Sequence, residues 1–95
     1  MNEITDEKLD KYFSLTEKAL LVIKVVATNG EFRKIAEDFL QMAKNYLSDA
    51  KHFRKKGDYV NAFAAVNYAH AWLDAGARMK IFDVGKEAGR LFASD

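Results

Sequence analysis

The sequence predicts an all-α protein, an antiparallel three-helix bundle with a short C-terminal helical segment. Hydrophobic residues recur at spacings of three and four along most of the chain, and no proline interrupts them. Two glycine turns, Asn29-Gly30 and Gly57-Asp58, divide this pattern into three long segments. A chain of 95 residues is enough for one domain, so we expect a single domain over residues 1–95. The expected helices cover about residues 5–28, 31–56 and 58–80, with a short helical tail at about 86–92.

The first helix has a clear start and an ambiguous end. Thr5 is a suitable N-cap, and Asp6 and Glu7 place carboxylates in the first turn, where the helix dipole favours them. The β-branched run from Val22 to Val26 is compatible with a strand, but its length and the flanking helix formers favour a helix. The predicted buried stripe of this helix is Leu9, Phe13, Thr16, Leu20, Ile23 and Ala27.

The second helix ends in a cluster of four cations, which complement the C-terminal end of the helix dipole. A phosphate site is the alternative interpretation, but the rest of the chain offers no matching basic patch. The four cations are Lys51, Arg54, Lys55 and Lys56. The predicted buried stripe of this helix is Phe32, Ile35, Ala36, Phe39, Met42, Ala43, Tyr46, Ala50 and Phe53.

The third helix, which Asp58 caps, is apolar on almost every side. A helix of this kind is normally covered on more than one side, so it lies between the other two helices, or a second protein covers it. Gly76 inside it costs about 1 kcal/mol relative to alanine, and close packing is the simplest compensation. We therefore predict self-association, most simply as a two-fold dimer. The predicted interface residues are Tyr59, Phe63, Trp72 and Gly76.

A polar stripe runs along one side of the third helix. His70, Asp74 and Arg78 follow one another at intervals of four and share one face. In one interpretation Asp74 orients His70, Arg78 holds an anion, and Tyr68 and Trp72 stack on a base or ring. In the other, the stripe is a solvated face with an Asp74–Arg78 pair that contributes about 0.2–0.5 kcal/mol.

Composition excludes several classes of function. The chain has no cysteine, which excludes disulfides, thiolate metal sites and cysteine nucleophiles. Its net charge of +1 gives no general attraction to nucleic acid or to an anionic membrane. The longest apolar run is too short to span a bilayer, and the N-terminus does not have the pattern of a signal peptide, so we expect a cytoplasmic protein. Asp49 and His52 have the spacing of a di-iron motif but lack further carboxylates at matching depth. We expect no metal, no cofactor and no catalytic site.

Two resemblances follow from motifs in the second half of the chain. Gly57, Asp58, Tyr59 and Ala62, followed by Ala69, resemble one tetratricopeptide-type hairpin, which implies only a tight antiparallel turn between two helices. The longer pattern resembles the archaeal family called domain of unknown function 357. It comprises Tyr46-x-x-Asp49-Ala50-x-x-Phe53, Gly57-Asp58-Tyr59-Val60-x-Ala62-Phe63-Ala64-Ala65-Val66, Tyr68-Ala69-His70-x-Trp72-Leu73-Asp74-Ala75-Gly76-Ala77-Arg78 and Phe82-Asp83-Val84.

That family resemblance implies a helical fold and an archaeal source, and it implies no activity. Some members look joined to nucleotidyltransferase-like domains. Ala71 and Lys80 stand where the family pattern often has glycine. The resemblance therefore does not predict the exact conformation of the turn after the third helix.

Two functional hypotheses therefore stand. The first is a non-catalytic interaction or assembly module that binds a second copy of itself or another protein. The second is a small-ligand or nucleotide-binding accessory domain that serves a nucleotidyltransferase-like partner through His70, Asp74 and Arg78.

Overall fold

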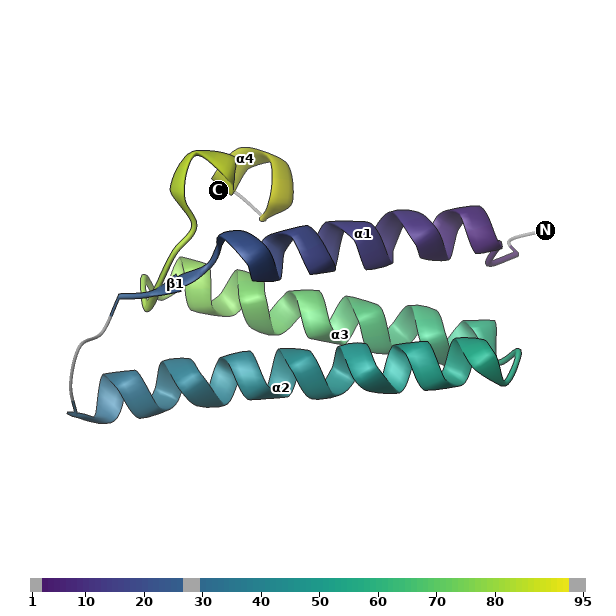
Figure 1. Cartoon of the computed structure of the whole chain (residues 1–95), viewed down its shortest axis with the longest axis horizontal. Helices are drawn as coiled ribbons and strands as arrows, with labels where there is room; N and C mark the ends of the chain where they lie inside the picture. The colour runs from purple at the N-terminus through teal and green to yellow at the C-terminus, as the bar shows by residue number, and fades with distance from the viewer. Residues whose placement is uncertain (1–2, 27–29, 93–95) are drawn as a thin grey trace.

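The molecule is built from three long helices, as expected. The computed structural model describes residues 3–26 and 30–92, without the side chains of residues 87 and 88. The long helices pack against one another, which confirms the all-α three-helix prediction (Figure 1). The elements in chain order are α1 (Asp6–Val22), β1 (Lys24–Val25), α2 (Gly30–Lys55), α3 (Tyr59–Arg78), β2 (Phe82–Asp83), a 3₁₀ turn (Gly85–Glu87) and α4 (Ala88–Leu91).

Helix α3 lies between the other two long helices. It packs against both α2 and α1, it runs parallel to α1, and α2 runs antiparallel to both (Figure 1). The α2–α3 hairpin turns at Gly57, whose φ of +79° is a left-handed conformation that suits glycine. Asp58 then caps α3 by accepting a hydrogen bond from the Asn61 amide at 3.2 Å. The tight antiparallel hairpin therefore forms as the motif predicts.

The prediction of a first helix as far as residue 28 was wrong. Helix α1 ends at Val22, and β1 pairs antiparallel with β2, with Lys24 opposite Asp83. The Val26 amide extends the ladder by donating to the Ile81 carbonyl at 3.0 Å. A β-branched run favours extended backbone once a partner strand is present, and this partner lies almost sixty residues away in the sequence. Ala27, the last residue of the predicted stripe, lies outside the described residues.

Gly76 is explained by one close packing contact within the chain. The Phe82 side chain lies where a β-carbon at residue 76 would be, and Phe82 itself is only 3% exposed. The predicted close packing at Gly76 is therefore present. Its partner is the ring that follows α3 in the same chain, which corrects the placement of Gly76 at an interface between molecules.

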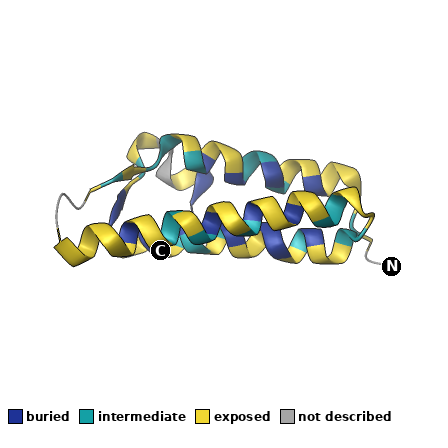
Figure 2. Cartoon of the chain, turned by 60° about the horizontal axis from the view of Figure 1, so that its bottom comes forward, coloured by how far each residue is buried: buried dark blue, intermediate teal, exposed yellow. Residues whose placement is uncertain are grey.

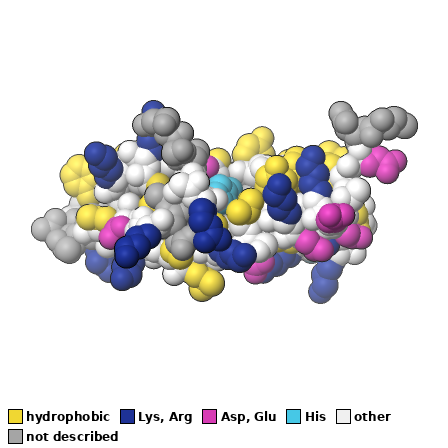
Figure 3. Space-filling model, turned by 90° about the horizontal axis from the view of Figure 1, so that it is seen from above, with side chains coloured by type: hydrophobic (Ala, Val, Ile, Leu, Met, Phe, Trp, Pro, Cys, Tyr) yellow, Lys and Arg dark blue, Asp and Glu magenta, His cyan; other side chains and the backbone are white. Residues whose placement is uncertain are grey.

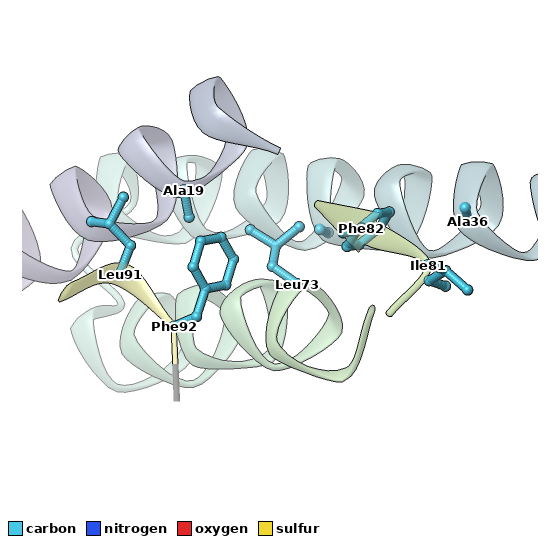
Figure 4. Close-up of a cluster of buried hydrophobic side chains, with 8 residues drawn as sticks. Ala19, Ala36, Leu73, Ile81, Phe82, Leu91 and Phe92 are labelled. Atoms are coloured by element: carbon cyan, nitrogen blue, oxygen red, sulfur yellow. The ribbon is translucent and has the colours of Figure 1, made fainter. Parts of the chain in front are cut away.

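The core is divided into two clusters along the bundle. The cluster nearer the β1–β2 pair contains every residue labelled in Figure 4, among them Leu91 and Phe92. The second cluster joins all three long helices near the α2–α3 turn. Its buried members are Phe13, Leu47, Ala50, Ala65, Val66 and Ala69.

Most of the predicted stripes are at least partly buried, but the start of α2 is not. Phe32 is 65% exposed and Ile35 is 36% exposed, so their predicted burial was wrong. The first turns of α2 extend past the end of α3, and Figure 2 shows them as exposed. Periodicity identifies the side of a helix that faces the core, but it does not show how far the neighbouring helix reaches.

The turn after α3 uses a conformation that suits glycine. Lys80 has a φ of +62°, the left-handed region that costs an L-residue about 1–2 kcal/mol. The turn at Lys80 therefore forms at the cost of backbone strain.

Candidate functional site

His70 joins three helices through its two ring nitrogens. Its Nε2 lies 2.6 Å from the carbonyl oxygen of Leu91, and its Nδ1 lies 3.0 Å from the hydroxyl of Thr16. A carbonyl only accepts, so Nε2–H donates to Leu91; in the neutral ring Nδ1 then accepts from Thr16. His70 therefore fastens α3 to α1 and to the C-terminal segment. In this arrangement neither ring nitrogen is left to serve as a base or a ligand.

Asp74 lies beside His70 but does not fix it as predicted. The Asp74 carboxylate is 3.7 Å from His70 Nε2, which is longer than a hydrogen bond. Thr16 and Leu91 orient the imidazole instead. The structure thus brings His70 and Asp74 together, whereas the expected role of Asp74 in orienting His70 is taken by other elements.

A shallow hollow of about 160 Å³ lies between α1 and α3 beside this pair. It is smaller than the roughly 300–1,000 Å³ of typical ligand pockets. Figure 3, which views the molecule from the side of α1 and α4, shows histidine atoms at the surface among charged side chains. Arg78, the proposed anion-binding residue, is exposed and is not among the lining residues. The hollow is lined by Tyr12, Leu15, Asn67, His70, Ala71 and Asp74.

Tyr68 and Trp72 face away from this hollow. The Trp72 ring meets Phe39 of α2 edge to face at 5.0 Å between centroids, and the Tyr68 ring lies 5.5 Å from that of Tyr46. Both rings therefore belong to the α2 side of α3. Their predicted stacking on a ligand held by His70 and Asp74 does not match this geometry.

Two of the predicted interface residues make contacts within the chain. The Tyr59 hydroxyl donates to the Asp6 carboxylate at 2.6 Å, and the Phe63 ring meets the Tyr12 ring edge to face at 5.1 Å. The Nζ atom of Lys8 lies 5.0 Å from the centre of the Phe63 ring. These two side chains therefore pin the start of α3 to α1.

The cationic end of α2 is used for the same purpose. Arg54 contacts the carboxylates of Asp10 at 2.7 Å and Asp6 at 3.1 Å, and Lys51 lies 3.5 Å from Glu17. The pKa of Asp6 is lowered by its hydrogen bonds from Tyr59 and Arg54, and the pKa of Tyr59 is raised mainly by its bond to Asp6. The sequence predicts the charges at the start of α1 and at the end of α2, but not that these charges pair with each other. These contacts favour a structural role for the cluster.

One large surface feature was not predicted residue by residue. A row of six apolar side chains along α3 is exposed to solvent, and we call it the outer face of α3. Val60 is 69% exposed, Tyr68 is 60% exposed and Met79 is 55% exposed. The full row is Val60, Ala64, Tyr68, Ala71, Ala75 and Met79. Its apolar character is visible in the sequence, but which part of the helix stays bare depends on where α1 and α2 pack.

Two other kinds of feature are absent from the described residues. In that part of the chain, no three His, Asp or Glu side chains are grouped so that they could hold a metal ion. None of the described helices combines the length and the hydropathy needed to cross a membrane.

Comparison with known families gives one match. A family model described as a protein of unknown function, DUF357, matches residues 11–82, well over half of the chain. The chain belongs to the DUF357 family. The DUF357 match includes His70, Asp74 and the whole outer face of α3, and it ends before α4. Neither the curated proteins nor the solved structures contain a match to this chain.

Proposed function

We propose that this DUF357 chain is a non-catalytic assembly module that associates through the outer face of α3, most simply with a second copy of itself. The observation that carries the proposal is the exposure of Val60, Tyr68 and Met79 on one face of one helix. Alanines occupy the positions between them, so charged side chains do not interrupt the row. In keeping with the family resemblance, we also propose an archaeal source. From the pattern of the N-terminus and the short apolar runs, we propose a cytoplasmic location.

The outer face of α3 is one contiguous apolar patch whose area can be estimated from the length of the helix. Twenty helical residues extend about 30 Å, so a stripe about 10 Å wide covers on the order of 300 Å². Scattered apolar side chains are normal on a protein surface, and the largest contiguous patch on a typical monomer, about 300–600 Å², is often functional. Covering this patch removes apolar surface from water, which is the general driving force for association.

Concentration-dependent mass tests this proposal. We expect light scattering between about 10 µM and 1 mM to show a rise from the mass of one chain toward that of two. Ala64→Glu places a charge within the outer face and should abolish the rise. Ser48→Glu is the matched control, because Ser48 is also exposed but lies on α2. A wild-type mass of one chain over the whole range would contradict self-association.

A small-ligand site is the second candidate, because the hollow between α1 and α3 brings His70 and Asp74 together with Tyr12. Its volume suits a small polar ligand or anion better than a nucleotide. Thermal unfolding with phosphate, sulfate and nucleotides tests it. A ligand-induced rise in melting temperature that Asn67→Ala, a substitution in the lining of the hollow, removes would support this candidate. No rise with any of these compounds would reject it.

A further inference from the structure

We infer that two copies pair through their α3 helices in one register, antiparallel about a two-fold axis between residues 69 and 70. The inference rests on the proposed function and adds the partner, the orientation and the facing residues. It starts from the spacing of the outer face, whose members are separated by four, four, three, four and four residues. That series reads the same in both directions.

The symmetry of this series matters because, in a two-fold dimer, both copies contribute the same surface to the interface. In an isologous interface each contact occurs twice, so the face must match its own reverse. With the axis at the midpoint of the series, every outer-face residue lies opposite another outer-face residue. An antiparallel crossing near 20° keeps two helices in contact over several turns, which this long row requires.

The sizes of the facing side chains are complementary in this register. Tyr68, the bulkiest member, lies opposite Ala71 of the second copy. Ala64 lies opposite Ala75, and Val60 lies opposite Met79. Facing alanines allow helix axes to approach to about 8 Å, the short end of the observed range. Near the axis, the large Tyr68 thus faces a small alanine. Large side chains face each other only at the two ends of the row, where Val60 meets Met79.

Charge favours the antiparallel orientation over a parallel one. Arg78 is exposed at the edge of the outer face, and in the inferred register it lies opposite Asn61 of the second copy. The two Arg78 positions are then about 25 Å apart along the pair. A parallel pair in matching register would place the two arginines side by side and align the helix dipoles unfavourably.

The area predicts a weak dimer. Two faces of about 300 Å² bury roughly 600 Å² in total, less than the about 1,200–2,000 Å² of stable interfaces. We therefore expect a dissociation constant between about 1 µM and 1 mM. A weak dimer still cross-links efficiently if the register places two reactive groups next to each other.

Cysteine cross-linking tests the register, because the natural chain contains no cysteine. Ala64→Cys and Ala75→Cys are made separately, and one of them carries a mass label. Facing β-carbons about 4 Å apart allow a disulfide. Under mild oxidation, we expect the mixed disulfide between residues 64 and 75 to form at least about tenfold faster than either symmetric one. Ser48→Cys on α2 is the control and should cross-link no faster than random collision.

The possible outcomes separate the inference from the proposed function. Faster symmetric cross-linking of Ala64→Cys with itself, in a protein that dimerises, would overturn the register and leave self-association standing. Equal rates for all pairs, including the control, together with the mass of one chain at about 1 mM, would overturn both. Circular dichroism of each variant confirms that the helices are intact, since both alanines are exposed.

Discussion

The two sides of α3 have nearly the same composition and opposite surroundings. Its inner side is apolar, consists largely of small residues and is covered by the rest of the chain. The outer face is just as apolar and is open to solvent. The hydropathy of the sequence therefore predicts how much of this helix is apolar. Only the packing of α1 and α2 determines which side of the helix stays exposed to solvent. The inner side is lined by Ala62, Ala65, Val66, Ala69, Leu73 and Gly76.

The largest expected difference between the two sides comes from truncating a bulky residue on each. Leu73 is fully buried, so Leu73→Ala should lower the free energy of unfolding by about 3 kcal/mol through lost burial and a cavity. Tyr68→Ala removes a mostly exposed ring and should cost less than about 1 kcal/mol in the monomer. Urea unfolding at low protein concentration measures both. Similar losses would mean that the two sides are not distinct.

Glycine and alanine exchanges give the next largest effect. Gly76→Ala introduces a better helix former, yet its β-carbon would overlap the Phe82 ring, so we expect a loss of about 2 kcal/mol. Ala75→Gly, one residue along on the outer face, should cost about 1 kcal/mol through helix propensity alone. Thermal unfolding compares them. A Gly76→Ala protein more stable than wild type would show that Phe82 does not occupy that space.

The turn that ends α3 gives a smaller change of opposite sign. Lys80→Gly should raise the free energy of unfolding by about 0.5–1 kcal/mol, because relief of left-handed strain outweighs the extra freedom of the unfolded chain. Lys56→Gly is a control at another exposed lysine near a helix end and should not stabilise. A lower melting temperature for Lys80→Gly would rule out strain at this turn.

The smallest effect concerns pH at the start of α3, where Tyr59 is tied to α1. Because folding lowers the pKa of Asp6, ionised Asp6 stabilises the protein above its ordinary value of 3.8, and this contribution disappears as pH falls through the lower folded pKa. Asp6→Asn should therefore be less stable than wild type at neutral pH. The difference should shrink as the pH falls below 3.8. A difference that stays constant with pH would assign the loss to packing and not to charge.

Local patterns predicted the long helices well because their signals lie in neighbouring residues. Thr5 accepts from the Lys8 amide as an N-cap should, and Gly57 turns the hairpin. What failed depended on residues far apart in sequence. The strand at Lys24–Val25 forms only because β2, almost sixty residues further along the chain, pairs with it.

The candidate site could also be predicted only in part. The sequence placed His70 and Asp74 on one face, and the structure agrees. It did not predict that Thr16 and the Leu91 carbonyl would use both nitrogens of His70, because these partners come from α1 and from the C-terminal segment. The contacts of Tyr59 and Phe63 with α1 were not predicted, for the same reason. Tyr59 and Phe63 are the sequence neighbours of Val60 and Ala64, and only the position of α1 determines which of the two pairs it contacts.

The central claim is that a second copy covers the outer face of α3. A dilution series of the protein with ¹³C-labelled alanine methyl groups tests it most directly, because α3 carries alanines on both sides. We expect the methyl resonances of Ala64, Ala71 and Ala75 to shift with concentration. The buried methyls of Ala62, Ala65 and Ala69 should stay in place. Outer methyls that do not move up to about 1 mM would contradict the claim.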